Sequence, residues 1–180
     1  MNGLEDPYDI ILEMDNAVRE NSSELPEQRV LRRLWSGIVF KIVGQLVVVP
    51  IDEVVEILIY PNMTNVPGLK NWMKGLANIR GNLLPVMDLK GFLTGKVIEL
   101  NKKSRVLSFN HAETSVGFVV EEVHGLRYFS VEKETEQAPQ LDDSLNPYLL
   151  TGYMDDEERH WGVFSLKKVV ETKGFLQTAA

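Results

Sequence analysis

The sequence predicts a mainly β protein built from two small five-stranded barrels, with short helices and an N-terminal helical extension. Three observations support this fold class. Apolar and polar residues alternate at period two along much of the chain after residue 36, which is typical of strands. The pattern repeats with an offset of about 69 residues, from Val49 to Phe118. Each repeat has only about 65 residues of short strands, which suits a small barrel better than a large sheet.

Residues 1–36 are predicted to form the helical extension. Within the segment 7–20, Ile11, Met14 and Val18 have the spacing of one helical face, so they form an apolar stripe. Such a stripe either packs on the core of its own chain or docks to a partner, and the sequence leaves both uses open.

The first repeat begins with a hairpin. Residues 38–43 and 46–49 are predicted strands around a turn at Gly44 and Gln45. Pro50 ends the second strand, because proline has no N–H to donate to a sheet. The remaining elements are expected in this order: a helical turn at 51–56, a strand at 57–60, a helix at 69–78, a break at Gly81, a strand at 83–87, and a short helix from its N-cap Asp88 to Leu93.

The second repeat follows the same order. Strands are predicted at 104–109 and 115–120 around a turn at 110–113, followed by a strand at 149–154, an acidic turn at 155–158, a strand at 161–165 and a helix from Leu166 to about Phe175. Repeat arrays need about three copies for stability, so two copies predict a pseudosymmetric pair that shares an interface. We expect a partner to bind in the groove between them.

Composition excludes several classes of function. The chain has 180 residues, of which 44% are apolar and 25% charged, and no cysteine. It therefore has enough apolar surface to fold, but no disulfide, thiolate metal site or cysteine nucleophile. The first residues are acidic, unlike a signal peptide, and no window reaches the ~18 apolar residues of a membrane span. We expect a cytoplasmic protein without direct membrane insertion.

The net charge of -7 is unevenly distributed. Residues 61–105 carry eight basic and two acidic side chains, whereas residues 106–160 carry three basic and twelve acidic ones. The basic block at 70–105 can attract a negatively charged partner such as nucleic acid. The alternative is that these are ordinary solvated charges.

No pattern indicates an enzyme, a metal site or a cofactor site. His111, His124 and His160 lack the spacing of metal ligands. Glu121 and Glu122 would point to opposite faces of a strand, which does not suit an acid/base pair. Nucleotide-binding glycine motifs and nucleophile motifs are absent from the sequence. We therefore expect no catalytic residue, no metal and no cofactor.

The segment 66–93 is the candidate for protein binding. Trp72 lies on the predicted helix, and Arg80 stands where that helix breaks. Tryptophan and arginine are enriched in protein interfaces. The alternative is structural: Trp72 is a core residue, and Arg80 pairs with Asp88 or Glu56.

The same segment resembles the signature of the CheW-like coupling domain. The family pattern N-L-R-G-x-x-x-P-x-x-D-L is matched by Asn78, Ile79, Arg80, Gly81, Pro85, Asp88 and Leu89. The runs V-P-I-D-E-V-V-E-I at 49–57 and Y-L-L-T-G at 148–152 also resemble the family and occur in its order, so the resemblance covers about residues 36–175. Within the family, the sequence is most similar to the adaptors of type IV pilus twitching-motility systems.

This resemblance implies a fold of two intertwined five-stranded SH3-like β-barrels over residues 37–175, with 1–36 as an extension and 176–180 as a tail. It also implies a non-catalytic adaptor that couples the cytoplasmic tip of a methyl-accepting chemoreceptor to the regulatory domain of a CheA-type histidine kinase. Such an adaptor is recruited to membrane-associated receptor arrays, here in control of twitching motility.

By matching positions, the resemblance implies four receptor-binding residues between the barrels: Val54, Glu56, Asn78 and Arg80. It does not identify the residues that contact the kinase. The alternative function is a small-barrel nucleic-acid-binding protein that uses the basic block at 70–105. Single-strand binders need aromatic side chains along the basic groove, and only Trp72 and Phe92 lie in this block. We therefore expect a protein partner and no nucleic acid.

Overall fold

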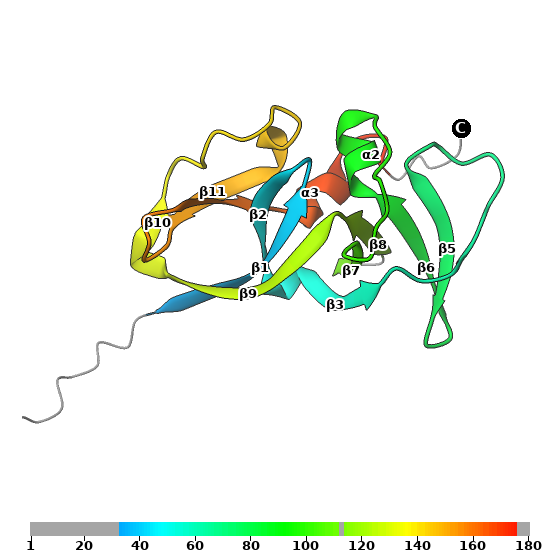
Figure 1. Cartoon of the computed structure of the whole chain (residues 1–180), viewed down its shortest axis with the longest axis horizontal. Coiled ribbons are helices and arrows are strands. Elements are labelled where there is room, and N and C mark those ends of the chain that lie inside the picture. The colour runs from blue at the N-terminus through cyan, green and yellow to red at the C-terminus, as the bar shows by residue number, and fades with distance from the viewer. Residues whose placement is uncertain (1–32, 112–113, 176–180) are drawn as a thin grey trace, which may run out of the picture. The chain divides into compact units, whose positions relative to one another are not determined.

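The computed structural model describes residues 33–111 and 114–175 (Figure 1). The helices predicted in the extension and the tail at 176–180 lie outside these residues. Within the described residues, no helix is both long and apolar enough to cross a membrane.

The first repeat follows the predicted order except at two places, an unpredicted strand at residues 63–64 and a strand at residues 73–79. Its elements are β1 (Leu34–Ile42), β2 (Gln45–Pro50), the 3₁₀ turn η1 (Ile51–Glu53), β3 (Val54–Ile59), β4 (Met63–Thr64), β5 (Met73–Ile79), β6 (Asn82–Asp88) and α2 (Leu89–Thr94). The first hairpin is confirmed, although its turn consists of Val43 and Gly44. The N-cap of α2 is also confirmed, because the Asp88 carboxylate accepts a hydrogen bond from the Gly91 amide.

The second repeat consists of β7 (Arg105–His111), β8 (Thr114–Val120), β9 (Glu122–Ser130), η2 (Val131–Lys133), β10 (Glu134–Thr135), η3 (Asn146–Tyr148), β11 (Leu149–Met154), β12 (His160–Phe164) and α3 (Leu166–Glu171). The predicted strand at 149–154 is confirmed at both ends. The terminal helix ends earlier than predicted.

The predicted helix at 69–78 is wrong, because most of this segment is the strand β5, antiparallel to β6. Its lysine, leucine, alanine and methionine favour a helix only weakly, and sheet pairing overrides such preferences. Gly75 shows why this segment cannot be a regular helix. It lies at φ 129° beside a register shift, and a Cβ there would collide with the backbone oxygen of Thr64.

The strands form two six-stranded sheets. Sheet I has the order β10-β11-β12-β2-β1-β9, and sheet II has the order β4-β5-β6-β8-β7-β3. The two orders become identical when β1 to β6 are matched with β7 to β12. Sheet I therefore contains the β1–β2 hairpin of the first repeat, which joins it through the parallel pair β2–β12. Sheet II contains the β7–β8 hairpin of the second repeat, which joins it through the parallel pair β6–β8. The repeats are intertwined, so neither repeat can complete its sheet alone.

Both sheets are open, with six strands where five per closed barrel were expected. Among the described residues, no strand pairing joins β9 to β10 or β3 to β4, which are the edge strands of the two sheets. The edge strands β4 and β10 have only two residues each, so they offer few groups for closure. A side chain of the edge strand β3 of sheet II nevertheless reaches the β5–β6 turn.

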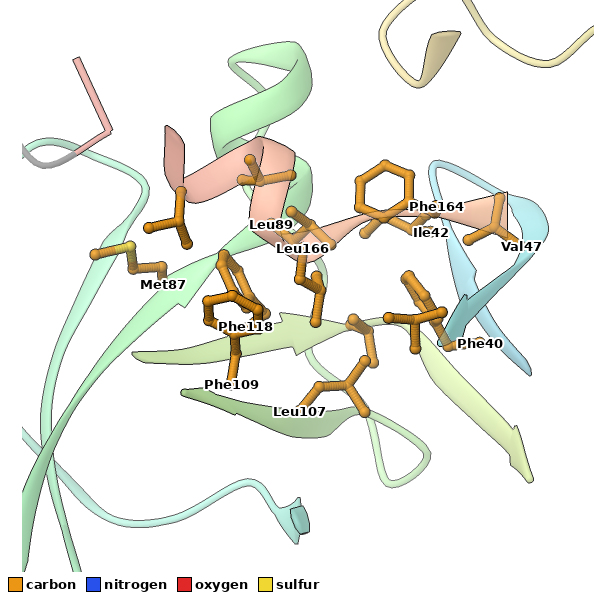
Figure 2. Close-up of a cluster of buried hydrophobic side chains, with 14 of the residues drawn as sticks. Phe40, Ile42, Val47, Met87, Leu89, Leu107, Phe109, Phe118, Phe164 and Leu166 are labelled. Carbon is orange, nitrogen blue, oxygen red and sulfur yellow. The ribbon is translucent and has the colours of Figure 1, made fainter. Parts of the chain in front are cut away.

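Three clusters of buried side chains form the core. The central cluster joins both sheets with both helices, and includes Phe40, Phe118, Leu89 and Leu166 (Figure 2). A second cluster lies on sheet I and contains Val39, Val48, Phe129, Tyr153, Trp161 and Val163. A third lies on sheet II with the segment after α2, and contains Ala77, Val86, Ile98, Val106 and Val119. Successive side chains of a strand point to opposite faces, so the inner strands supply two clusters at once.

Candidate partner-binding site

The β5–β6 turn presents Arg80 to solvent. Ile79 pairs with Asn82, and the two residues between them, Arg80 and Gly81, have φ values of 51° and 89°. These are the positive φ values of a type I′ turn, in which asparagine and glycine are preferred. An ordinary side chain in this region costs about 1–2 kcal/mol. Arg80 therefore occupies a strained position, with its side chain 80% exposed.

Asn78 stabilises this turn. Its Oδ1 atom accepts a hydrogen bond of 2.9 Å from the Gly81 amide, as asparagine side chains commonly do in turns. The sequence prediction placed Asn78 in the receptor-binding site. That prediction is not tested by the structure, which shows that the Asn78 side chain holds the turn that carries Arg80.

Glu56 lies opposite Arg80 on the edge strand β3. Its Oε1 atom is 2.6 Å from the Arg80 Nη2 atom, and its side chain is 32% exposed. The structure thus contains one of the two pairings expected for Arg80, whereas Asp88 is buried and pairs with Lys74 at 3.1 Å. An exposed ion pair of this kind contributes about 0.2–1 kcal/mol. Because the contribution is small, the guanidinium can exchange Glu56 for a carboxylate of a partner.

Glu56 and Arg80 line a shallow groove of about 470 Å³ on sheet II. Two neighbours in the groove are apolar and exposed, Val55 at 65% and Leu83 at 68%. Polar side chains contribute the rest of one side: Ser108, Asn110 and Ser115. The groove therefore combines an ion pair with exposed apolar side chains, which suits a protein interface.

Sequence reasoning missed Val55 and Leu83. Both side chains lie on the exposed face of a strand, and the alternation of residues along that strand could have identified them. Val55 was placed in a helical turn at 51–56, and Leu83 at the start of a predicted strand whose outward face was not assigned. Val54 was named instead, but it is half-buried and packs against the central cluster.

Trp72 and the basic block have structural partners. The Trp72 ring packs edge-on against Phe92 at 5.3 Å and stacks on Phe175 at 5.8 Å. Four of the eight basic side chains of the block are paired with carboxylates: Lys74 with Asp88, Arg80 with Glu56, Lys90 with Glu121, and Lys103 with Glu122. These pairings and the packing of Trp72 disfavour the basic groove with free aromatic platforms that single-strand binding requires.

Sheet I has a charge-reversed counterpart of the Glu56–Arg80 pair. Here the guanidinium belongs to the edge strand, on Arg127 of β9, and the carboxylate to the β11–β12 turn, on Asp155, at 3.0 Å. Asp155 is only 9% exposed. Burial raises its pKa, but hydrogen bonds from the Trp161 indole and from the Arg159 and Glu157 amides, with the Arg159 charge, outweigh burial and lower the pKa to about 2. The counterpart on sheet I thus has a largely buried carboxylate held by several partners, whereas the carboxylate on sheet II is 32% exposed.

No cluster of three or more histidine or acidic side chains suited to a metal ion occurs within residues 33–111 and 114–175. Ser108 is the cross-strand partner of Glu56, but no hydrogen bond joins the two side chains in the described structure, so the groove does not present an activated serine. The chemistry available in the groove is recognition through charge, hydrogen bonds and apolar contact.

Comparisons with known proteins agree with this architecture. The model of the CheW-like domain matches residues 36–173. The chain is 38% identical over 179 residues to protein PilI of Pseudomonas aeruginosa, covering 99% of each chain. It is 29% identical over 103 residues to chemotaxis protein CheW of Bacillus subtilis, covering 57% of this chain and 65% of that protein. Among solved structures, the scaffolding protein TtCheW from Thermoanaerobacter tengcongensis has a similar fold, with a TM-score of 0.66 at 21% identity over 78% of this chain and 94% of that one.

Proposed function

This chain belongs to the CheW-like family, and from that premise we propose that it is a non-catalytic adaptor that couples a methyl-accepting chemoreceptor to a CheA-type histidine kinase. The relative PilI matches nearly the whole chain, including the residues before the CheW-like domain. That likeness supports a role in type IV pilus twitching motility. The adaptor would be recruited to membrane-associated receptor arrays by its partners.

The exposed Glu56–Arg80 groove is the observation that carries the receptor assignment. The tip of a receptor hairpin is a helical bundle rich in glutamate. A glutamate of that tip would replace Glu56 on the Arg80 guanidinium, while an apolar residue one turn away would cover Val55 and Leu83. Asn78 and Val54 would act indirectly, by holding the turn and the start of β3.

The kinase contact is proposed on a different basis. The regulatory domain of a CheA-type kinase is itself CheW-like, so a pseudosymmetric surface of this chain would meet a similar surface of the kinase. The adaptor would then hold receptor and kinase in a fixed relative position without chemical change to either.

Co-sedimentation with a receptor fragment tests this function. The probe is a soluble fragment that carries the helical-hairpin tip of a methyl-accepting receptor. Arg80→Glu is expected to weaken binding at least tenfold, because a carboxylate then faces the partner's glutamate. Its melting temperature should stay within about 3 °C of the parent, because the exposed pair contributes little to stability.

Lys103→Glu is the matched control. Lys103 forms an exposed ion pair with Glu122 at 3.2 Å, with side-chain exposures of 70% and 27%, close to those of Arg80 and Glu56. The charge change is identical, but Lys103 is not among the groove residues. If the two variants lose binding equally, the effect is one of net charge and the receptor assignment is wrong.

A further inference from the structure

The chain crosses between the two sheets at two places, and an acidic side chain anchors each crossing. The first crossing is η1, between β2 of sheet I and β3 of sheet II. The second lies at Glu121, between β8 of sheet II and β9 of sheet I. Glu121 contacts Lys90 of α2 and the Gly44 amide, each at 2.9 Å. Glu53 at the first crossing contacts α3.

Glu53 supplies most of the capping of α3. Its Oε1 atom accepts a hydrogen bond of 2.8 Å from the Ser165 hydroxyl. Its Oε2 atom accepts from the Leu166 amide at 2.6 Å and the Lys167 amide at 3.2 Å. The first amides of a helix have no partner within the helix, and a carboxylate beside them is favourable in charge. This cap comes from a residue more than 100 positions earlier in the chain, so it joins the two repeats.

Glu53 also adjoins the groove. It is followed directly by Val54, which packs against the central cluster that contains Leu166 of α3. Glu56, which pairs with Arg80, stands three residues after Glu53. The start of β3 is therefore tied to α3 through the Glu53 carboxylate and to the central cluster through Val54. A displacement of Glu56 on partner binding would act on both ties.

From this arrangement we propose that Glu53 is a positioning residue that couples the Glu56–Arg80 groove to the first turn of α3. When the Glu56–Arg80 pair opens, the start of β3 is held less firmly, the Glu53 cap weakens, and the amides of Leu166 and Lys167 become less protected. The inference rests on the proposed function only for the identity of the molecule that opens the pair. Through this coupling, binding of a partner in the groove of sheet II would change the stability of the first turn of α3 in the second repeat.

Amide hydrogen exchange of the full chain without any partner is the first test. Arg80→Ala, which opens the pair, is expected to speed exchange of the Leu166 and Lys167 amides by about threefold or more. In a Glu53→Ala background, Arg80→Ala should not speed the exchange of these amides any further, because the Glu53 cap that couples the groove to α3 is already absent. Unchanged exchange in Arg80→Ala, or equal effects in both backgrounds, would overturn the coupling.

Asp52→Ala is the matched control for Glu53→Ala. Asp52 is the neighbouring acid of the same 3₁₀ turn, is exposed, and makes no cap hydrogen bond. The Arg80→Ala effect on α3 should persist in the Asp52→Ala background. Glu53→Gln keeps one acceptor oxygen, so it should restore part of the effect. A rescue of this kind separates positioning from a general loss of structure.

The receptor fragment provides the second test. Glu53→Ala is expected to weaken fragment binding about fivefold and Asp52→Ala less than twofold. If the fragment fails to bind even the parent chain, the proposed function is wrong, and the exchange experiment alone decides the coupling. A different outcome would overturn the coupling alone. In that case the fragment binds the parent and needs Arg80, the Glu53→Ala variant binds as tightly as the parent, and Arg80→Ala leaves amide exchange at α3 unchanged. The proposed function would then stand and the role of Glu53 would be wrong.

Discussion

Arg80→Asn separates the two roles that a residue at the tip of the β5–β6 turn can have. Asparagine is preferred at the first central position of a type I′ turn, where Arg80 has φ 51°. The substitution therefore relieves backbone strain while it removes the guanidinium. Stability and binding should respond in opposite directions.

The magnitudes follow from the geometry of the turn. Relief of the left-handed conformation is worth about 1 kcal/mol. Loss of the Glu56–Arg80 pair, whose arginine is 80% exposed, costs about 0.2–1 kcal/mol. The net change in the free energy of unfolding is then between zero and about +1 kcal/mol, which corresponds to a rise in melting temperature of about 0–4 °C.

Binding should fall at the same time. A charge-assisted contact between a guanidinium and a partner carboxylate is worth about 2–3 kcal/mol, so the affinity for the receptor fragment should drop by roughly 30- to 150-fold. The assays are thermal unfolding and fluorescence titration with the fragment. Arg80→Lys is the control, since it keeps the charge and the strain but loses the planar fork, and should lose less affinity without any gain in stability.

Two results would refute this reasoning. A fall in melting temperature of more than about 5 °C would mean that Arg80 supports the fold. Unchanged affinity would mean that the receptor does not contact this turn.

Two further predictions concern stability. Gly75→Ala should lower the free energy of unfolding by about 2–3 kcal/mol in urea denaturation, because Gly75 has φ 129° and a Cβ would collide with Thr64; if the segment were the helix first expected, the same change would instead stabilise it by about 1 kcal/mol. Asp155 has a folded pKa of about 2, below its ordinary value of 3.8, so its contribution of about 2 kcal/mol is present above pH 4 and is lost as the pH falls toward 2. Asp155→Asn should therefore be less stable than the parent at pH 7, with a difference that shrinks between pH 4 and pH 2; a difference independent of pH would contradict the assigned pKa.

Local sequence patterns predicted the elements whose interactions are local. The hairpin β1–β2 is visible from alternation around a glycine turn, and α2 from a capping aspartate followed by apolar residues. The strand β5 was not visible, because Met73, Leu76 and Ala77 fit a helical face as well as a strand. Its state depends on pairing with β6 and on the close approach of Thr64 at Gly75.

The candidate site was predicted only in part, because some of its residues can be identified only from the pairing of strands. Arg80 and Glu56 were both named from the sequence, and their pairing was one of the alternatives considered. Val55 and Leu83 required the correct face of β3 and β6, and that face is known only once the register is known. The cap of α3 by Glu53 had no sequence signal, since its partners lie more than 100 residues away.

By itself, the sequence determined the β character of the chain, the repeat, the absence of cysteine chemistry and the likeness to an adaptor family. These properties depend on composition, on short-range periodicity and on a contiguous signature. The tertiary structure alone decided which repeat supplies each hairpin and which charges are paired. It also decided that Arg80 pairs with a partly exposed carboxylate, whereas Arg127 pairs with the largely buried carboxylate of Asp155. Those outcomes depend on contacts between residues far apart in the chain, and the free energy of such contacts exceeds the small local preferences that a sequence pattern reports.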